Sequence, residues 1–123
     1  MVYPIADRVF FAFSDSRRPE IYWIVPISSK YEKYKEIEQR KIKKYGKCNT
    51  IRFGTVLGRK SVFLIQNMCP TTEKYLTPYI DKNMQPIRID GRIAADVIKN
   101  ARATLAMAKR GAKVLFRLLK SLQ

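Results

Sequence analysis

Four short apolar runs alternate with polar and turn-forming stretches over the first half of the chain. They cover residues 8–13, 21–27, 50–57 and 61–66. Their length and their content of β-branched and aromatic residues are typical of strands. A polar break separates the first two runs, and the segment between the last two contains Gly58, which can adopt the positive φ of a tight turn. The pattern therefore predicts two β-hairpins.

Two longer segments carry apolar residues at the helical spacing of three and four. The first covers residues 30–45 and precedes Gly46, a residue type that commonly ends helices. Its apolar residues fall within one arc that should face the core: Tyr34, Ile37, Ile42 and Tyr45. The second covers residues 92–109, with Asp90 as its cap and Gly111 as its expected end.

Two weaker apolar runs, residues 86–90 and 113–116, predict a fifth and a sixth strand. Short strands interleaved with two helices favour an α+β fold, in which a compact, highly bent antiparallel β-sheet or partial barrel has its helices packed outside. The length of 123 residues predicts a single domain, residues 1–123.

The charge of the chain indicates what kind of partner it binds. The chain has 25 basic and 10 acidic residues, for a net charge of +15. Such a charge usually implies a polyanionic partner, with nucleic acid as the first candidate and an anionic membrane surface as the second. Basic residues concentrate at residues 30–47 and after Asp96, and we expect these two segments to form one positive groove.

Several classes of protein and site are disfavoured by composition. No apolar run reaches the roughly 18 residues of a spanning helix, and the first residues do not resemble a signal peptide. There is no histidine, and Cys48 and Cys69 do not have metal-ligand spacing, so we expect no metal, no other cofactor, and two reduced, buried thiols. A cytoplasmic protein fits these features.

The segment Ser28-Ser29-Lys30 lies between an apolar run and the first predicted helix, and it has two interpretations. In the first, Ser29 and Glu32 form a capping box at the helix start. In the second, the two hydroxyls and the lysine bind a phosphate at the positive end of the helix. The two interpretations are compatible, and both stay open.

The absence of histidine also restricts the chemistry of any RNA cleavage. It excludes a histidine-pair ribonuclease, and the ten acidic residues are too scattered for a carboxylate metal site. What remains is cleavage by the 2′-OH of the RNA itself, for which the protein aligns the strand and stabilises charge on the phosphate.

Three motifs carry a resemblance to a known family. The segments YWIVPISSKYEKY, KKYGKCNTIRFGTVLG and FLIQNMCPTTEKY together resemble the toxins of type III toxin–antitoxin systems, the ToxN/AbiQ group, with the CptN-like branch closest. The resemblance covers about residues 20–116. It implies a metal-independent endoribonuclease that cuts A-rich cellular or phage RNA and leaves a 2′,3′-cyclic phosphate. It also implies a small repeat RNA antitoxin, which the toxin processes into inhibitory pseudoknots within a closed protein–RNA assembly.

The resemblance also implies site residues. It places the active hydroxyl pair at Ser28 and Ser29, with Ser29 the more important. Its catalytic lysine falls on Lys30 or Lys33, because the family pattern has a proline between the hydroxyls and the lysine that this chain lacks. A basic residue at the start of the preceding strand corresponds to Arg8.

Further residues are expected to bind RNA. Tyr31 is the best stacking candidate, whereas Tyr34 and Tyr45 are expected in the core. Gln66 and Asn67 either line the serine pocket or close a turn. The remaining candidates are expected to bind antitoxin phosphates: Lys43, Lys44 and Lys47.

Two other functions stay open. One is a non-catalytic RNA-binding module with the same basic groove. The other is a membrane-surface or DNA-binding protein that uses the basic C-terminal helix. The alanine-rich stripe of that helix suits packing on a sheet better than insertion into lipid.

Overall fold

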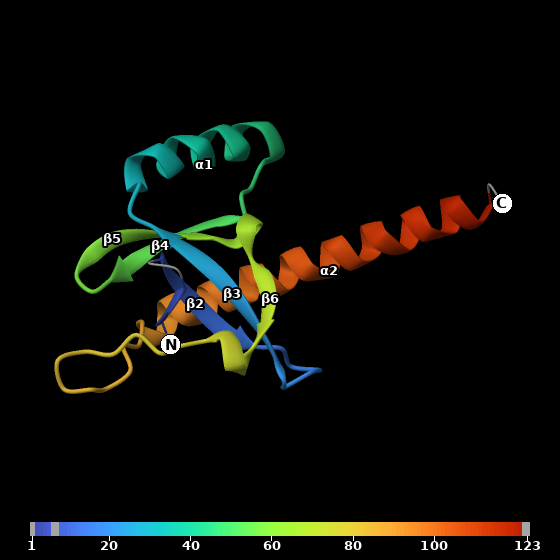
Figure 1. Ribbon diagram of the computed structural model, residues 1–123. Coiled ribbons are helices and arrows are strands. Elements are labelled where there is room, and N and C mark those ends of the chain that lie inside the picture. The colour runs from blue at the N-terminus through green and yellow to red at the C-terminus, as the bar shows by residue number, and fades with distance from the viewer. Residues whose placement is uncertain (1, 6–7, 122–123) are drawn as a thin grey trace.

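The computed structural model describes the backbone of residues 2–5 and 8–121 and the side chains of residues 9–106. The described part has an α+β fold in which six antiparallel strands and two long helices are the main elements (Figure 1). The strands are β1 (Val2–Ile5), β2 (Arg8–Ser14), β3 (Ile21–Ser28), β4 (Ile51–Val56), β5 (Arg59–Leu64) and β6 (Cys69–Thr72). The helices are α1 (Tyr31–Tyr45) and α2 (Gly91–Ser121). The predicted fold class is confirmed.

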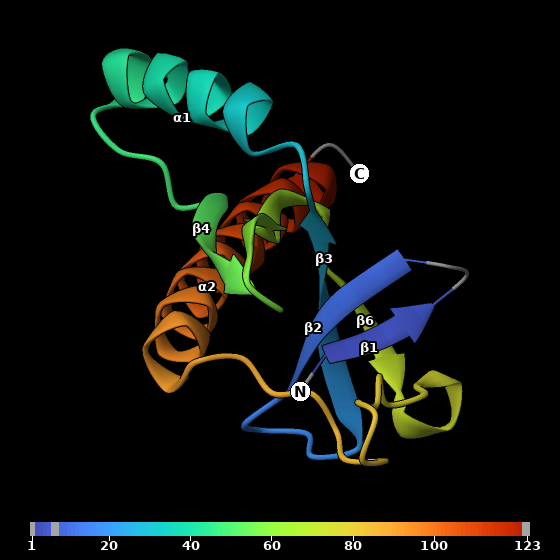
Figure 2. The ribbon, with the colours of Figure 1, turned by 90° about the vertical axis from the view of Figure 1, so that its left-hand side faces the viewer.

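Strand β3 is the centre of the sheet, whose order is β1-β2-β3-β5-β4 with β6 also paired to β3. One edge of β3 pairs with β2. On the other edge, residues 21–24 pair with β6, and Ile27 and Ser28 pair with β5. Pro26, which has no N–H to donate, lies in the gap between these two partners. The sheet divides at this point into two arms that do not close into a barrel within the described strands (Figure 2).

The two helices cover opposite faces of the β4–β5 hairpin. On β4, Ile51 and Phe53 pack in the cluster beneath α1, whereas Val56 packs in the cluster that contains Val97 and Ala101 of α2. This alternation follows from the period of two along a strand. The hairpin is closed by Leu57 and Gly58, both at positive φ, as in the tight turn that the sequence predicts.

Both predicted hairpins are confirmed, but three element predictions are wrong. Residues 86–90 form no strand and make a single isolated bridge, between Pro86 and Ile80. Gly111 does not end α2, and residues 113–116 lie within this helix. One glycine costs a helix only about 1 kcal/mol, and the surrounding alanine, lysine, arginine and leucine residues favour helix. The end of α2 consequently projects beyond the strands (Figure 1).

Candidate functional site

Strand β3 runs into α1 through only two residues, Ser29 and Lys30. The Ser28 hydroxyl oxygen accepts a hydrogen bond from the Lys30 amide at 3.1 Å, and the Ser29 carbonyl accepts one from the Tyr31 amide at 2.9 Å. Lys30 is the N-cap residue, and no side chain caps the helix. The predicted capping box of Ser29 and Glu32 is therefore wrong, because α1 begins one residue later than the box requires.

This arrangement leaves the Ser29 side chain available. Ser29 is exposed, and its hydroxyl makes no hydrogen bond to any residue that the structure describes. Lys30 is also exposed, and no described carboxylate lies within 4.0 Å of its ammonium. An available hydroxyl and an available cation thus stand side by side at the start of a helix, where the dipole adds positive potential.

Both serines line two neighbouring hollows, and we call the boundary that these hollows share, formed by the serines with Val9 and Ile27, the serine ridge. The Asn67 hollow, of about 450 Å³, is lined by both serines together with Lys30 and Asn67. The Arg59 hollow, of about 510 Å³, is lined by the same serines with Arg59 and Tyr79. Val9 and Ile27 contribute apolar wall to both. A chain molecule that crosses the ridge can therefore place one unit in each hollow.

The structure separates several residues that the sequence associates with the serines. Lys30 lines the Asn67 hollow, whereas Lys33 lines neither hollow and extends its ammonium to 5.5 Å from the centre of the Tyr34 ring. Arg8 begins β2, but its side chain lies outside the described residues. Its neighbour Val9 lines both hollows, so the end of β2 does reach the site.

Gln66 and Asn67 share a short 3-10 turn, Ile65–Asn67, yet only Asn67 lines the serine site. The Lys41 ammonium donates to Gln66 Oε1 at 3.1 Å and to Thr50 Oγ1 at 3.2 Å. This contact draws Gln66 toward the far half of α1. Of the two interpretations, the turn holds for both residues, and a place beside the serines holds only for Asn67.

The burial of the α1 tyrosines differs from the prediction at two of the three positions. Tyr31 is partly buried, with its ring edge-on to Phe53 at 5.2 Å between centroids, so it is poorly placed to stack on a base. Tyr34 is partly buried, as expected, and lines the Asn67 hollow. Tyr45, which was expected in the core, is 66% exposed. Tyr45 is the last residue of α1, at the point where the chain leaves the helix for the connection to β4, so no further turn of the helix lies beside its ring.

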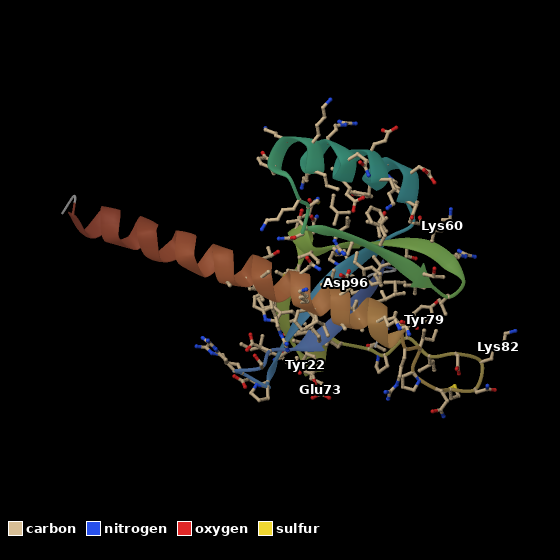
Figure 3. The ribbon with its side chains drawn as sticks, turned by 180° about the vertical axis from the view of Figure 1, so that it is seen from behind. Tyr22, Lys60, Glu73, Tyr79, Lys82 and Asp96 are labelled. Atoms are coloured by element: carbon tan, nitrogen blue, oxygen red, sulfur yellow. The ribbon has the colours of Figure 1, made fainter. Side chains whose placement is uncertain are left out.

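Two residues at the site were missed by the sequence analysis. The sequence does contain a signal for Arg59, because this residue directly follows the hairpin turn at Gly58 and such a position lies at the exposed tip of a hairpin. Tyr79 had none, since it comes from the irregular segment before α2 and reaches the serines only through the tertiary fold. Figure 3 shows Tyr79 near the first turn of α2, at the same end of the molecule as Lys60.

The remaining predicted RNA contacts, Lys43, Lys44 and Lys47, are all exposed and lie at the end of α1 and just beyond it. Among the described residues, three ion pairs satisfy the distance limit of 4.0 Å. One of them joins Arg52 of β4 to Asp96 of α2, and its hydrogen bonds raise the pKa of Arg52 above the usual arginine value. Most of the described cations remain available to a polyanion.

The cysteines differ from each other. Cys48 is buried, as predicted, but Cys69 is exposed at the start of β6, where its prediction as a buried thiol is wrong. Both are free thiols. Among the described residues no group of three or more metal-ligating side chains occurs, and no helix has the length and hydropathy needed to cross a membrane.

No protein-family model matches the sequence, and no curated protein matches it.

Proposed function

We propose that the protein is a metal-independent endoribonuclease toxin of a type III toxin–antitoxin system, acting in the bacterial cytoplasm on A-rich RNA. Its product ends are a 2′,3′-cyclic phosphate and a 5′-OH, and its inhibitor is the repeat RNA antitoxin that it processes. One observation carries the proposal. The Ser29 hydroxyl is exposed and uncommitted beside Lys30, on a ridge between two hollows.

The chemistry needs no group beyond the RNA and the side chains of the ridge. The 2′-oxygen of the RNA attacks the adjacent phosphorus, the bond from phosphorus to the 5′-oxygen breaks, and the 5′-oxygen gains the proton that the 2′-OH loses. Ser29 donates to a phosphate oxygen or positions the 2′-OH. Lys30 offsets the negative charge that grows on the phosphate, and such electrostatic stabilisation commonly accounts for most of an enzyme's rate enhancement.

The two hollows supply the alignment. With the scissile phosphate on the ridge, one neighbouring nucleotide enters the Asn67 hollow and the other enters the Arg59 hollow. Holding both neighbours restricts rotation about the scissile bond and favours the in-line geometry that cleavage requires. Tyr79 offers a ring for stacking, and Arg59 offers a planar cation for phosphate.

The test is cleavage of an A-rich single-stranded RNA in excess EDTA, with the product ends identified. Wild type should cleave, and Ser29→Ala should lose roughly 100-fold or more in rate, as when one oxyanion donor is removed. Ser16→Ala, which alters an exposed serine of the β2–β3 turn, is the matched control and should cleave normally. A substrate with a 2′-deoxyribose at the cut site should stay intact.

The competing function is a non-catalytic RNA-binding module, and the same experiment separates the two. Intact RNA that binds wild type and Ser29→Ala equally well would establish the binding module. Cleavage that stops in EDTA would contradict the metal-independent mechanism.

A further inference from the structure

A third hollow lies at the opposite end of α1 from the serines. It has a volume of about 680 Å³ and a largely apolar wall, and it is bounded by the last turn of α1, the connection to β4 and α2. Because a helix rises about 1.5 Å per residue, the 15 residues of α1 separate it from the serine ridge by on the order of 20 Å. We refer to it as the Tyr45 hollow.

The rim of the hollow carries an aromatic ring that the fold does not use. Tyr45 is 66% exposed, and Ile42, which the sequence also predicted to face the core, is 38% exposed. The Lys44 ammonium lies 5.2 Å from the centre of its ring. An exposed ring beside a cation is the arrangement with which proteins stack an unpaired base and neutralise its phosphate.

The wall carries an amide without a partner among the described residues. Asn49 lines the hollow and is partly buried, yet its side chain makes no hydrogen bond to any of them. An asparagine amide presents one donor and one acceptor side by side. This pair matches the N6 donor and N7 acceptor of adenine, whereas guanine presents two acceptors at the same edge.

The charge around the hollow favours an anion. The Lys41 ammonium is held by two neutral oxygens, those of Thr50 and Gln66, and no described carboxylate lies within 4.0 Å of it. Lys47 also lines the hollow and is exposed. The carbonyl end of α1 opposes them with only about half a negative charge. The local potential is therefore positive.

We propose that the Tyr45 hollow is a second RNA-contact site, which holds one unpaired adenine nucleotide at a distance from the serine ridge. The base stacks on Tyr45 and pairs its N6 and N7 with the Asn49 amide, and the phosphate lies against Lys47. The inference shares with the proposed function only the assumption that the ligand is RNA, and it does not depend on cleavage.

The first experiment titrates the intact protein with adenosine monophosphate and follows the amide signals of residues 41–50 by nuclear magnetic resonance. Wild type should bind with shifts centred on this segment. Tyr45→Ala should weaken binding roughly 5- to 100-fold, the range for one lost stacking contact. Tyr75→Ala is the matched control, because Tyr75 is 65% exposed with the Lys74 ammonium 4.9 Å from its ring but lines none of the described hollows. Equal losses in both variants, or shifts centred elsewhere, would overturn the proposal.

The second experiment tests the identity of the base. Wild type should prefer adenosine over guanosine monophosphate, and Asn49→Ala should remove that preference while the stacking contribution remains. Unfolding by urea should show that Tyr45→Ala and Asn49→Ala remain as stable as wild type, because neither loses a described hydrogen bond. Equal binding of the two nucleotides by wild type would refute the assignment to adenine.

The two proposals fail separately. A wild-type protein that binds adenosine monophosphate through Tyr45 but cleaves no RNA would support the hollow and reject the nuclease. A protein that cleaves RNA through Ser29, with nucleotide binding indifferent to Tyr45, would reject the hollow and support the nuclease.

Discussion

At the scale of single residues, Ser28 and Ser29 are neighbours with different roles. Ser28 turns its oxygen to the backbone of Lys30 and helps to join β3 to α1. Ser29 is exposed, and its hydroxyl makes no hydrogen bond to any described residue. A residue that contributes little to the fold but lies between two hollows is best explained by what it binds. The pair thus combines one hydroxyl that the fold uses and one that it leaves available for the proposed function.

This division predicts different effects of two alanine substitutions on the stability of the fold. Ser28→Ala should lower the free energy of unfolding by about 0.5–1 kcal/mol, because it removes one partly exposed hydrogen bond. Ser29→Ala should leave it unchanged within about 0.5 kcal/mol. Urea unfolding measures both values. A greater loss in Ser29→Ala than in Ser28→Ala would show that Ser29 is mainly structural.

The sequence located the serines but not their surroundings. The end of an apolar run followed at once by a helical pattern is a local signal, so the junction at residues 28–31 was predictable. The different surroundings of the Gln66 and Asn67 side chains were not predictable, because Gln66 is held by Lys41, which lies 25 positions away in the sequence. The exposure of Tyr45 was equally hidden, since periodicity shows which face of a helix is apolar and not whether a strand lies beneath it.

At the scale of elements, α2 approaches β4 so closely that one position tolerates no side chain. A Cβ atom added to Gly54 would lie 2.8 Å from Ile93 Cγ2 and 3.2 Å from Phe63 Cε2. The absence of a side chain at this point lets the first turns of α2 lie directly on the hairpin. The distance between α2 and the sheet is therefore set by a glycine.

Gly54→Ala should accordingly destabilise the protein by about 1–3 kcal/mol, as overpacking generally does. Removing the obstructing Ile93 side chain should recover part of this loss. The double variant Gly54→Ala/Ile93→Ala should therefore lose less free energy of unfolding than the two single variants lose together. Thermal or urea unfolding of the four proteins completes the cycle. Strict additivity would show that Ile93 is not what the added methyl group meets.

The same helix and strand are joined by a charged pair. Arg52 Nε lies 2.7 Å from Asp96 Oδ2, and a second guanidinium nitrogen lies 2.9 Å from Asp96 Oδ1. Figure 3 shows Asp96 on α2 at the middle of the molecule. The bidentate geometry makes this pair stronger than an ordinary surface pair, although each side chain is about a third exposed.

Asp96→Asn should therefore lower the free energy of unfolding by about 1 kcal/mol, and less at high salt. The exposed pair between Glu36 and Arg40, 3.7 Å apart, is the control, and Glu36→Gln should have almost no effect. Because the pKa of Arg52 is raised, its contribution is lost only as the pH rises through that raised value, far above neutral. The loss of unfolding free energy caused by Asp96→Asn should hence be constant from neutral to moderately alkaline pH.

Element types were predictable where the apolar run was long, as in β3 and β4 despite Pro26 and Gly54, and they were not where a short run contained a proline. The pairing of β2 with β3 follows from two apolar runs with a polar break between them. The pairing of β4 with β5 follows from two apolar runs and the turn glycine Gly58. The strands β1 and β6 each contain a proline and only four residues, so no run marks them. Their pairing is supplied by the long neighbours β2 and β3, a tertiary effect that overrides weak local preference.

At the scale of the whole molecule, the net charge is +15, and among the described residues three basic side chains lie within 4.0 Å of a carboxylate. The predicted groove joins residues 30–47 to the basic residues after Asp96, and the side chains of that second segment beyond residue 106 lie outside the described residues. Within the first segment, Lys30 lines the Asn67 hollow, and Lys41 and Lys47 line the Tyr45 hollow. Composition could foretell the sign and size of the charge. Its arrangement needed the fold, because the hollows are assembled from segments far apart in the sequence.

This charge predicts a steep dependence of RNA affinity on salt. Each phosphate contact to single-stranded nucleic acid contributes about −0.7 to the slope of log affinity against log salt, so roughly five contacts give a slope near −3.5. Measurements by fluorescence anisotropy with a non-cleavable 2′-O-methyl RNA would determine the slope. A value near −1 would contradict the view that the basic surfaces bind the RNA backbone.

If one RNA strand occupies both proposed sites, the direct continuation of β3 into α1 sets the length of strand between them. The serine ridge stands at the first turn of a rigid rod, and the Tyr45 hollow stands at its last turn, 15 residues later. A strand that occupies both must therefore span a constant distance between its anchored adenine and its cut. For the proposed nuclease α1 would then act as a ruler, and lengthening it by two turns would move the cut along the RNA by a fixed number of nucleotides while leaving both end points intact.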